Sequence, residues 1–203
     1  MREGKSMARP AEFDRDEVLE KAMNLFWETG YTATSVNALV DATQLKPGSL
    51  YGAFHSKRDL FLETIDVYAQ RSLTRISNNF LKAESAIKGI EAFFSNLCLD
   101  LEADEIGKSC FLVNTILELS YENEEIRDKV TDYLDEIESY FLKAIIEAQQ
   151  LGELDSSINP EDLATYLMTS IWGLRVLSSK RPSKEKYQAV IQNVLRVLHT
   201  PAH

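Results

Sequence analysis

The side chains best suited to chemistry in this chain lie in one short segment, and the chemistry they suit is phosphate binding. Residues 42–58 (ATQLKPGSLYGAFHSKR) contain the basic side chains of Lys46, Lys57 and Arg58 and no acidic one. Because this segment carries no negative charge, it would not repel a phosphate of the DNA backbone. Between these cations lie four small residues, which let a helix backbone approach DNA closely: Gly48, Ser49, Gly52 and Ala53.

Two further residues of this segment have both a binding and a structural interpretation. Tyr51 offers a hydroxyl to a phosphate, and it can equally pack beneath its own helix. His55 can contact a phosphate or cap the turn that follows. Lys57 stands at a predicted helix N-terminus, which is already an anion site.

Catalysis and metal binding have little support in the sequence. A carboxylate-bridged metal site in a helical bundle needs Glu-x-x-His pairs on facing helices. None of the three histidines, His55, His199 and His203, lies three residues after a glutamate. Since no phosphate loop, nucleophile elbow or zinc motif is present either, we expect no enzyme activity, no cofactor and no metal.

Composition restricts the kind of DNA binder that this chain can be. It has 203 residues, with 22 Lys and Arg against 32 Asp and Glu, which gives a formal charge of −10. Bulk positive charge is therefore excluded as the basis of binding. Residues 1–71 hold 9 basic and 11 acidic side chains, whereas residues 72–203 hold 13 and 21, so most of the negative charge lies outside the first part.

The expected cellular compartment is inferred from the N-terminus, the apolar stretches and the cysteines. The N-terminus is polar, and no apolar stretch approaches the roughly 18 residues of a membrane span. Cys98 and Cys110 form no disulfide framework. We therefore expect a reduced cytoplasmic protein without a membrane segment.

Apolar spacing of three and four residues predicts an all-α fold. A helix over 14–30 ends at Gly30, and a short helix follows with Thr34 as its expected N-cap. Pro47 opens a second short helix, and Ser56 with Asp59 forms a capping box that starts a helix of more than 20 residues. Two short helices joined by a tight turn and packed on a first helix make a helix-turn-helix, here at 35–54.

The remainder of the chain reads as long amphipathic helices that could enclose an effector. We place them near 84–103, 109–120, 123–151, 159–179 and 184–198. Aromatic residues among polar ones on these helices are typical of a ligand pocket, although ordinary core packing explains each one alone. The predicted pocket residues are Phe94, Cys98, Cys110, Phe111, Asn114, Glu118, Tyr140, Trp172 and Arg175.

Cys110 has a second interpretation as a sensor of oxidants or electrophiles. It follows Gly107-Lys108-Ser109 near a predicted helix start, where the helix dipole and Lys108 would stabilise a thiolate. The alternative, a small packing residue, is the simpler one.

Fixed spacings in the first part resemble the DNA-binding domain of the TetR/AcrR family of bacterial regulators. The resemblance covers about residues 12–72 and is carried by Leu25-Phe26, Gly30-Tyr31, Thr34-Ser35-Val36, Leu39, Ala42, Gly48-Ser49-Leu50-Tyr51, Phe54, Ser56-Lys57 and Leu60-Phe61. Two positions depart from the pattern. Lys46 stands where the family usually has a capping Ser or Thr, and Gly52-Ala53 replace larger aromatic or histidine side chains.

The resemblance implies a regulator with three parts. These are an N-terminal arm over 1–11, a DNA-binding domain over 12–72 and a helical effector-binding and dimerisation domain over 73–203. The arm carries Arg2, Lys5 and Arg9, which could reach a groove or remain a solvated tail. By family analogy Thr34, Ser35, Tyr51 and Lys57 contact phosphates, and Lys46, Pro47, Gly48 and Ser49 line the groove.

The expected function is a ligand-responsive repressor that binds a near-palindromic operator as a homodimer. Its dimer would form through the last two helices, whose apolar faces could also be explained by packing within one chain. An apolar or aromatic small molecule would release it from double-stranded DNA. An interaction module without DNA binding is the alternative, and the complete helix-turn-helix argues against it.

Overall fold

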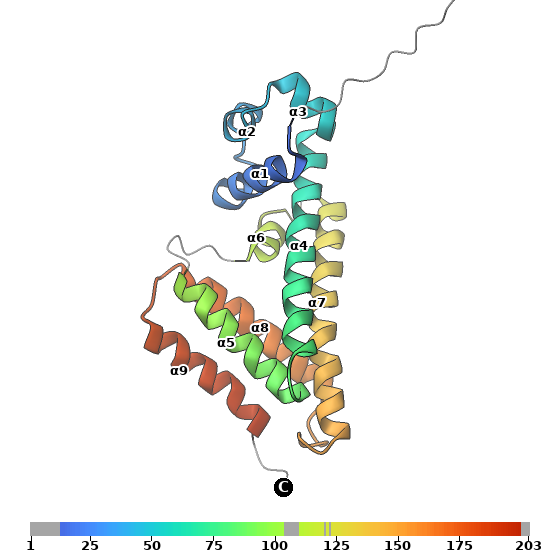
Figure 1. Cartoon of the computed structure of the whole chain (residues 1–203), viewed down its shortest axis with the longest axis vertical. Coiled ribbons are helices and arrows are strands. Elements are labelled where there is room, and N and C mark those ends of the chain that lie inside the picture. Colours follow the sequence, from blue (N-terminus) through green and yellow to red (C-terminus); the bar gives the residue numbers. More distant parts are fainter. Residues whose placement is uncertain (1–12, 104–109, 120, 122, 200–203) are drawn as a thin grey trace, which may run out of the picture. The chain divides into compact units, whose positions relative to one another are not determined.

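The computed structural model describes residues 13–103, 110–119, 121 and 123–199, and over these residues the chain is helical without a strand (Figure 1). The predicted all-α fold is confirmed. The chain forms two compact units, Met1–Thr64 and Ile65–His203. The arm predicted for residues 1–11 lies outside the described residues.

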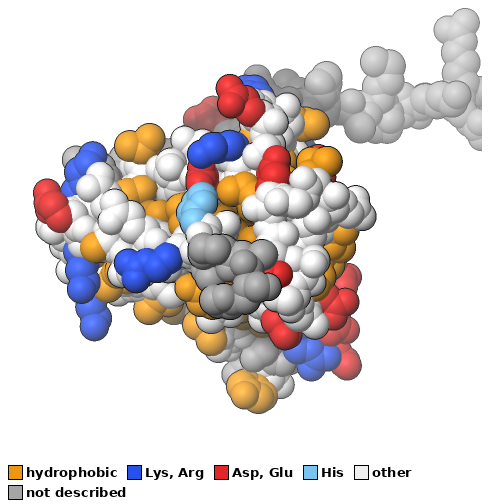
Figure 2. Space-filling view, turned by 90° about the horizontal axis from the view of Figure 1, so that it is seen from below, with side chains coloured by type: hydrophobic (Ala, Val, Ile, Leu, Met, Phe, Trp, Pro, Cys, Tyr) orange, Lys and Arg blue, Asp and Glu red, His pale blue; other side chains and the backbone are white. Residues whose placement is uncertain are grey.

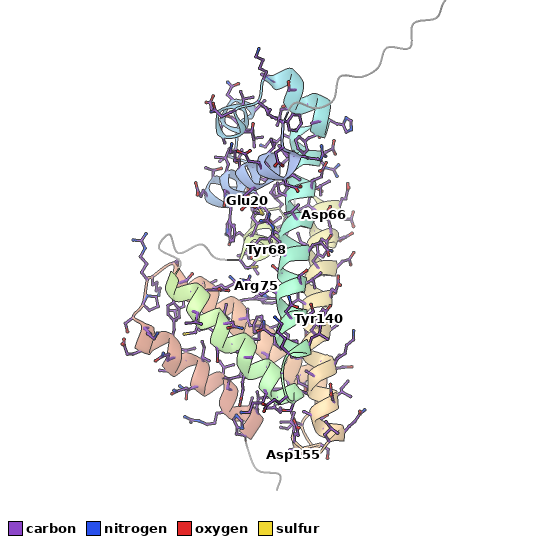
Figure 3. All side chains as sticks on the ribbon, in the orientation of Figure 1. Glu20, Asp66, Tyr68, Arg75, Tyr140 and Asp155 are labelled. Carbon is purple, nitrogen blue, oxygen red and sulfur yellow. The ribbon has the colours of Figure 1, made fainter. Side chains whose placement is uncertain are left out.

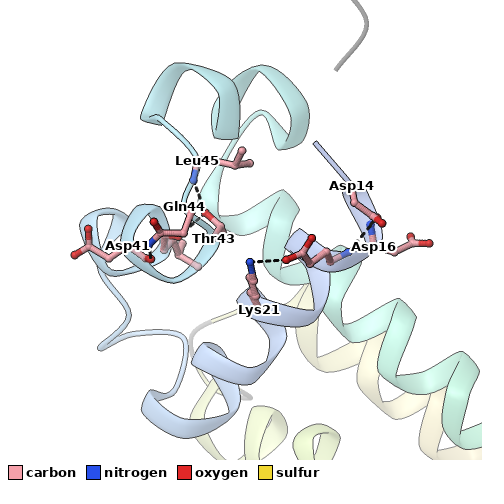
Figure 4. Close-up of polar contacts among 9 residues, drawn as sticks. Asp14, Asp16, Lys21, Asp41, Thr43, Gln44 and Leu45 are labelled. Carbon is pink, nitrogen blue, oxygen red and sulfur yellow. Dashed lines mark hydrogen bonds and ion pairs between the residues drawn. The ribbon is translucent and has the colours of Figure 1, made fainter. Parts of the chain in front are cut away.

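The first unit contains three helices and the start of a fourth. These are α1 (Arg15–Thr29), α2 (Val36–Thr43), α3 (Pro47–Phe54) and α4 (Lys57–Leu81), which continues into the second unit. Asp14 caps α1, since its carboxylate accepts the backbone N–H groups of Asp16 and Glu17 (Figure 4). Gly30 ends α1 with φ of 79°, a conformation that favours glycine.

The N-cap of α2 is Ser35 and not Thr34, which corrects the prediction. Ser35 Oγ accepts the N–H of Ala38 at 3.1 Å. Thr34 is buried, and its hydroxyl donates to the carbonyl oxygen of Gly30. Thr34 thus stabilises the bend between α1 and α2 from inside, and Ser35 has the extended backbone that a cap requires.

An aromatic cluster forms the core of the first unit. Phe26, Phe54 and Phe61 are each 1% exposed. The rings of Phe26 and Phe61 meet edge to face with centroids 4.9 Å apart, and Tyr31 covers Phe61 at 4.7 Å. The cluster joins α1 to α4 and gives the short helices α2 and α3 a fixed base.

The second unit packs its helices around α7. It contains the rest of α4, α5 (Ala86–Ala103), α6 (Phe111–Leu119), α7 (Glu124–Gln150), α8 (Pro160–Ser178), α9 (Lys184–Leu195) and a 3₁₀ turn over Arg196–His199. Helix α7 packs against α5, α6 and α8, and α9 packs against α5 and α8. The helix predicted over 184–198 ends earlier as an α-helix, at Leu195, because its last turn tightens into 3₁₀ geometry, as helix ends often do.

Close packing in the second unit explains one glycine. A Cβ on Gly89 of α5 would come within 2.7 Å of Cδ1 of Phe80 on α4. Phe80 in turn packs edge to face on Phe141 of α7, with centroids 5.6 Å apart. A larger residue at 89 would push these helices apart.

The surface seen in Figure 2 mixes charged side chains of both signs with isolated hydrophobic ones. His199 lies 2.8 Å from a carboxylate oxygen of Glu91, which ties the 3₁₀ turn to α5. No helix among the described residues is long and apolar enough to cross a membrane.

Candidate nucleic-acid interface and effector cavity

Helices α2 and α3 are joined by a turn whose hydrogen bonds fix its shape (Figure 4). Gln44 has a left-handed backbone with φ of 60°, and its side-chain amide donates to the carbonyl of Asp41. The hydroxyl of Thr43 accepts the N–H of Leu45 at 3.4 Å. Two helices held at a tight turn are the geometry of a helix-turn-helix.

The N-terminal turn of α3 is exposed over four consecutive predicted residues, Lys46, Pro47, Gly48 and Ser49. Lys46 is the N-cap residue and provides no side-chain cap, because an ammonium group cannot accept a hydrogen bond. Its positive charge adds to the partial positive charge of the helix N-terminus. This turn is therefore exposed and positively charged.

The two glycines of α3 have no packing role inside the chain. A Cβ built on Gly48 or Gly52 would meet no atom within 4 Å, and both residues are exposed. Glycine inside a helix costs up to about 1 kcal/mol relative to alanine. Packing within the described part of the chain therefore does not require glycine at either position.

The opposite side of α3 is anchored by Leu50 and Phe54, both buried. Arg15 of α1 holds the end of the helix: it donates to the carbonyl of Ala53 at 3.1 Å and to both carboxylate oxygens of Glu63 at 2.7 Å. Its guanidinium also lies 4.2 Å from the ring centroid of Phe54. Sequence reasoning missed Arg15, although a basic residue in the first turn of a helix opposes the helix dipole and was a usable signal.

The start of α4 carries the Ser56 half of the capping box that the sequence predicted; the backbone N–H of Ser56 donates to the carbonyl of Phe54 and not to the Asp59 carboxylate. Ser56 Oγ accepts the N–H of Asp59 at 3.0 Å and donates to its carboxylate at 2.7 Å. The ammonium of Lys57 lies 4.4 Å from the ring centroid of Tyr31. Burial is the largest cause of a raised pKa at Tyr31, so the ring stays neutral and serves as a platform for the cation.

The remaining predicted DNA-binding residues differ in exposure. Ser35 and His55 are exposed, and Tyr51 and Lys57 are half-buried. His55 has φ of 60°, and its backbone N–H donates to the carbonyl of Tyr51, which ends α3 and leaves the imidazole at the surface. Thr34 is buried, so its hydroxyl is occupied within the fold.

A cavity of about 50 Å³ lies inside the second unit and is lined by three of the predicted pocket residues, Cys110, Trp172 and Arg175. Its wall is otherwise mostly aliphatic and aromatic, from α4, α5, α6, α7 and α8. It also contains polar residues of α4 and α5 that sequence reasoning missed: Tyr68, Ser72, Arg75, Asn79, Asn96 and Asp100. The spacing 68, 72, 75, 79 is one polar stripe along a helix, and this signal could have found them.

The other predicted pocket residues lie elsewhere. Phe94 is fully buried in the core, and Phe111 packs beneath Tyr68 with ring centroids 5.6 Å apart. Cys98 lines a groove between α5 and α9. Tyr140 of α7 lines another groove, between α7 and the connection from α4 to α5. Asn114 and Glu118 of α6 do not line the cavity. The spacing of apolar residues along a helix indicates which side chains face the interior. It does not indicate whether an inward side chain fills the core or lines a cavity.

Tyr68 and Cys110 interact directly at the cavity wall. The Tyr68 hydroxyl donates to the Cys110 sulfur at 3.7 Å, and both side chains are buried. Burial and the adjacent thiol raise the pKa of Tyr68, so it remains a neutral donor. Gly107, Lys108 and Ser109, invoked for a reactive thiolate, lie outside the described residues.

Comparison with known proteins relates both units to one family. Residues 18–64 match the family described as bacterial regulatory proteins, tetR family, and residues 86–194 match the tetracyclin repressor-like C-terminal domain. The HTH-type transcriptional repressor ComR of Escherichia coli (strain K12) is 29% identical over 194 residues, which cover 95% of this chain and 92% of ComR. YezE of Bacillus subtilis (strain 168), an HTH-type transcriptional regulator, is 27% identical over 95% of this chain and 100% of its own length.

A solved structure extends this likeness to three dimensions. The TetR family transcriptional regulator CifR, solved as a cysteine mutant with 26-base-pair double-strand operator DNA, is 32% identical, with a TM-score of 0.84 over 93% of this chain and 98% of CifR. Since family matches cover both units and CifR aligns over nearly the whole chain, this protein belongs to the TetR family of bacterial regulatory proteins and is a DNA-binding transcriptional regulator.

Proposed function

We propose that this protein is a repressor that binds a near-palindromic operator as a homodimer, with α3 of each protomer in a major groove. The observation that carries the proposal is the exposed turn Lys46–Ser49, followed by Gly52, a second glycine that the fold does not require. A regulator that acts on operator DNA works beside the bacterial chromosome, in the cytoplasm.

Phosphate contacts come from polar groups around α3. Ser35, Tyr51, His55 and Lys57 each present a donor at or near the surface. Thr34 is assigned a different role, because its hydroxyl is buried in the bend before α2. Base edges are read by Lys46 and Ser49 at the N-terminal turn of α3, where a short recognition helix makes its few specific contacts.

Salt dependence separates these two roles. We expect operator affinity to fall steeply with salt. Lys57→Ala should weaken binding to operator and to random DNA alike. It should also lower the slope of log affinity against log salt concentration by about 2, since the dimer loses one phosphate contact per protomer and each contributes about 0.9. Lys46→Ala should also change sequence preference. Lys143→Ala on α7 removes the same charge from an exposed position and is the control.

The assay is fluorescence anisotropy with labelled DNA from upstream of the protein's own gene. A flat salt dependence would contradict phosphate-driven binding. An equal loss of affinity in the Lys143→Ala protein would show that Lys57 acts only through the net charge of the protein, and would contradict a phosphate contact by Lys57.

Dimerisation through α8 and α9 rests on a different face from the one the sequence suggested. Leu163, Leu167, Ile171 and Leu174 of α8 are buried within their own chain. The surface of α8 instead exposes Tyr166 by 44% and Val176 by 54%, with Thr169 and Gly173 between them in helical register. Helix α9 adds Val190, and the 3₁₀ turn that follows it adds Val197; both are half-buried.

This face can be tested by sedimentation. Val176→Glu should convert the dimer to monomer at micromolar concentration, because it places a charge in an apolar interface. Leu151→Glu, at a position 65% exposed after α7, is the control and should leave the dimer intact. A wild-type protein that sediments as a monomer would refute the dimer.

The cavity of the second unit is the proposed effector site. Its apolar wall and few polar groups are typical of small-molecule sites. An effector releases the operator only by binding one conformation of the dimer more tightly than the other. At about 50 Å³ the cavity is much smaller than most ligand sites, so a bound effector must rearrange its walls.

A further inference from the structure

The cavity of the second unit shares one wall with a much larger groove on the surface. This groove measures about 690 Å³ and lies between α4 and α5. Four side chains line both spaces: Arg75 and Asn79 of α4, and Asn96 and Asp100 of α5. They therefore separate the interior of the unit from solvent at this point, and Figure 3 shows Arg75 on the side of α4 that carries Tyr68.

The shared wall consists of two side-chain pairs that cross from helix to helix. Arg75 forms an ion pair with Asp100, and one helical turn away the amide of Asn96 donates to Asn79 Oδ1 at 2.6 Å. The side chains of Arg75 and Asp100 are 48% and 45% exposed. An ion pair so exposed contributes little stability, so a ligand can separate it without unfolding α4 or α5.

Charge and polarity differ sharply between the two sides of this wall. The groove contains the basic residues Arg71, Arg75 and Lys82 against the single acid Asp100, and its other residues carry no charge. The cavity behind it is lined mainly by apolar side chains, together with the polar side chains of Tyr68, Ser72 and Arg175; the apolar ones are Ile76, Phe93, Leu97, Leu112, Leu134, Ile137, Met168, Ile171 and Trp172. In a chain with a formal charge of −10, the groove thus has a local excess of positive charge beside a mainly apolar space.

We propose that the α4–α5 groove admits and holds the head group of an amphipathic monocarboxylate. The ligand carboxylate takes the place of Asp100 on the Arg75 guanidinium, a bidentate partner for carboxylates, with Arg71 and Lys82 adding attraction. Its apolar tail passes between the four side chains into the cavity, where the flexible side chain of Met168 can make room. This inference names the ligand class of the proposed effector site and rests on that proposal.

The test is isothermal titration calorimetry of the full chain, without DNA, with sodium octanoate as the probe. Octanamide has the same tail without the charge, octylamine reverses the charge, and butyrate shortens the tail. We expect octanoate to bind at least tenfold more tightly than each of the other three. Octanoate that gives no binding at millimolar concentration, or that binds no better than octanamide, overturns the proposal.

Two variants test the exchange at Arg75. Asp100→Asn should raise octanoate affinity severalfold, because it removes the competing carboxylate, and a gain of affinity cannot arise from misfolding. Arg75→Gln should lower it at least tenfold. Arg127→Gln on α7, which removes an exposed ion-paired arginine away from the groove, is the control and should change nothing.

A loss of octanoate affinity in Asp100→Asn, or an equal loss in Arg127→Gln, overturns the proposed site. Because calorimetry is done without DNA and operator binding is measured without ligand, failure here leaves the DNA-binding proposal intact. Octanoate that binds as expected and leaves the operator complex unchanged would support the site and count against its role as the effector site.

Discussion

Gly52→Ala should make this protein more stable and a poorer binder of DNA. Gly52 is the sixth of eight residues in α3, is exposed, and has space for a Cβ with no atom within 4 Å. Alanine in a helix interior is favoured over glycine by about 0.5–1 kcal/mol, which corresponds to a rise in Tm of about 1–4 °C for a chain of this size. In the complex proposed above, the same methyl group would lie between the helix backbone and DNA, twice per dimer. We expect a loss of about tenfold or more in operator affinity, equivalent to about 1.4 kcal/mol.

Thermal unfolding followed by circular dichroism measures the first effect, and anisotropy with operator DNA measures the second. Thr131→Ala in α7 is the matched control, because it improves helix propensity by a similar amount in the other unit. This control should raise Tm and leave operator affinity unchanged. A Gly52→Ala protein with raised Tm and undiminished affinity would refute the argument that DNA approaches the α3 backbone.

Three further predictions concern the supports of the site. Arg15→Lys should destabilise the first unit by about 1 kcal/mol in thermal unfolding, because one ammonium cannot bind the Ala53 carbonyl and the Glu63 carboxylate together, as the two terminal nitrogens of Arg15 do; an unchanged Tm would show that these contacts contribute little stability. Ser56→Ala should cost about 1 kcal/mol through loss of the α4 cap and Ser56→Thr much less, and equal losses would contradict a capping role. Burial, followed by the hydrogen bond to Asp66, raises the pKa of Tyr133 from 10.0 to about 12, so its stabilising contribution is complete below pH 10.0 and is lost as the pH rises toward 12. Tyr133→Phe should therefore show a smaller fall in Tm between about pH 9 and about pH 11, and a fall as steep as that of the wild type would contradict the shift.

Helix identity and the family were predictable because they depend on local chemistry. Ser56 caps α4 through the N–H of Asp59 within one turn, and Gly30 ends α1 through its own backbone. Such features need only neighbours in sequence. The choice between Thr34 and Ser35 as cap was not predictable, since it depends on which hydroxyl the packing of α1 and α2 leaves exposed.

Which residues line the cavity of the second unit could not be predicted from the sequence, because this cavity forms where several helices meet. Cys110, Trp172 and Arg175 line it, whereas Phe94 and Phe111 fill the core beside it. Each of these residues has an inward-facing pattern, and helix rotation and crossing decide which of them borders open space. The predicted DNA-binding residues other than Thr34 have exposed or half-exposed side chains, and their contacts remain predictions to be measured.

The sequence by itself determined the all-α fold, the helix-turn-helix and the acid-free edge, because periodicity, caps and charge are properties of nearby residues. Only the tertiary structure decided that Arg15 anchors the end of α3 across 38 positions, and that Arg75 and Asp100 separate a cavity from a groove. Those contacts join residues distant in sequence, and no local preference encodes them. Their partners are set by how the helices pack.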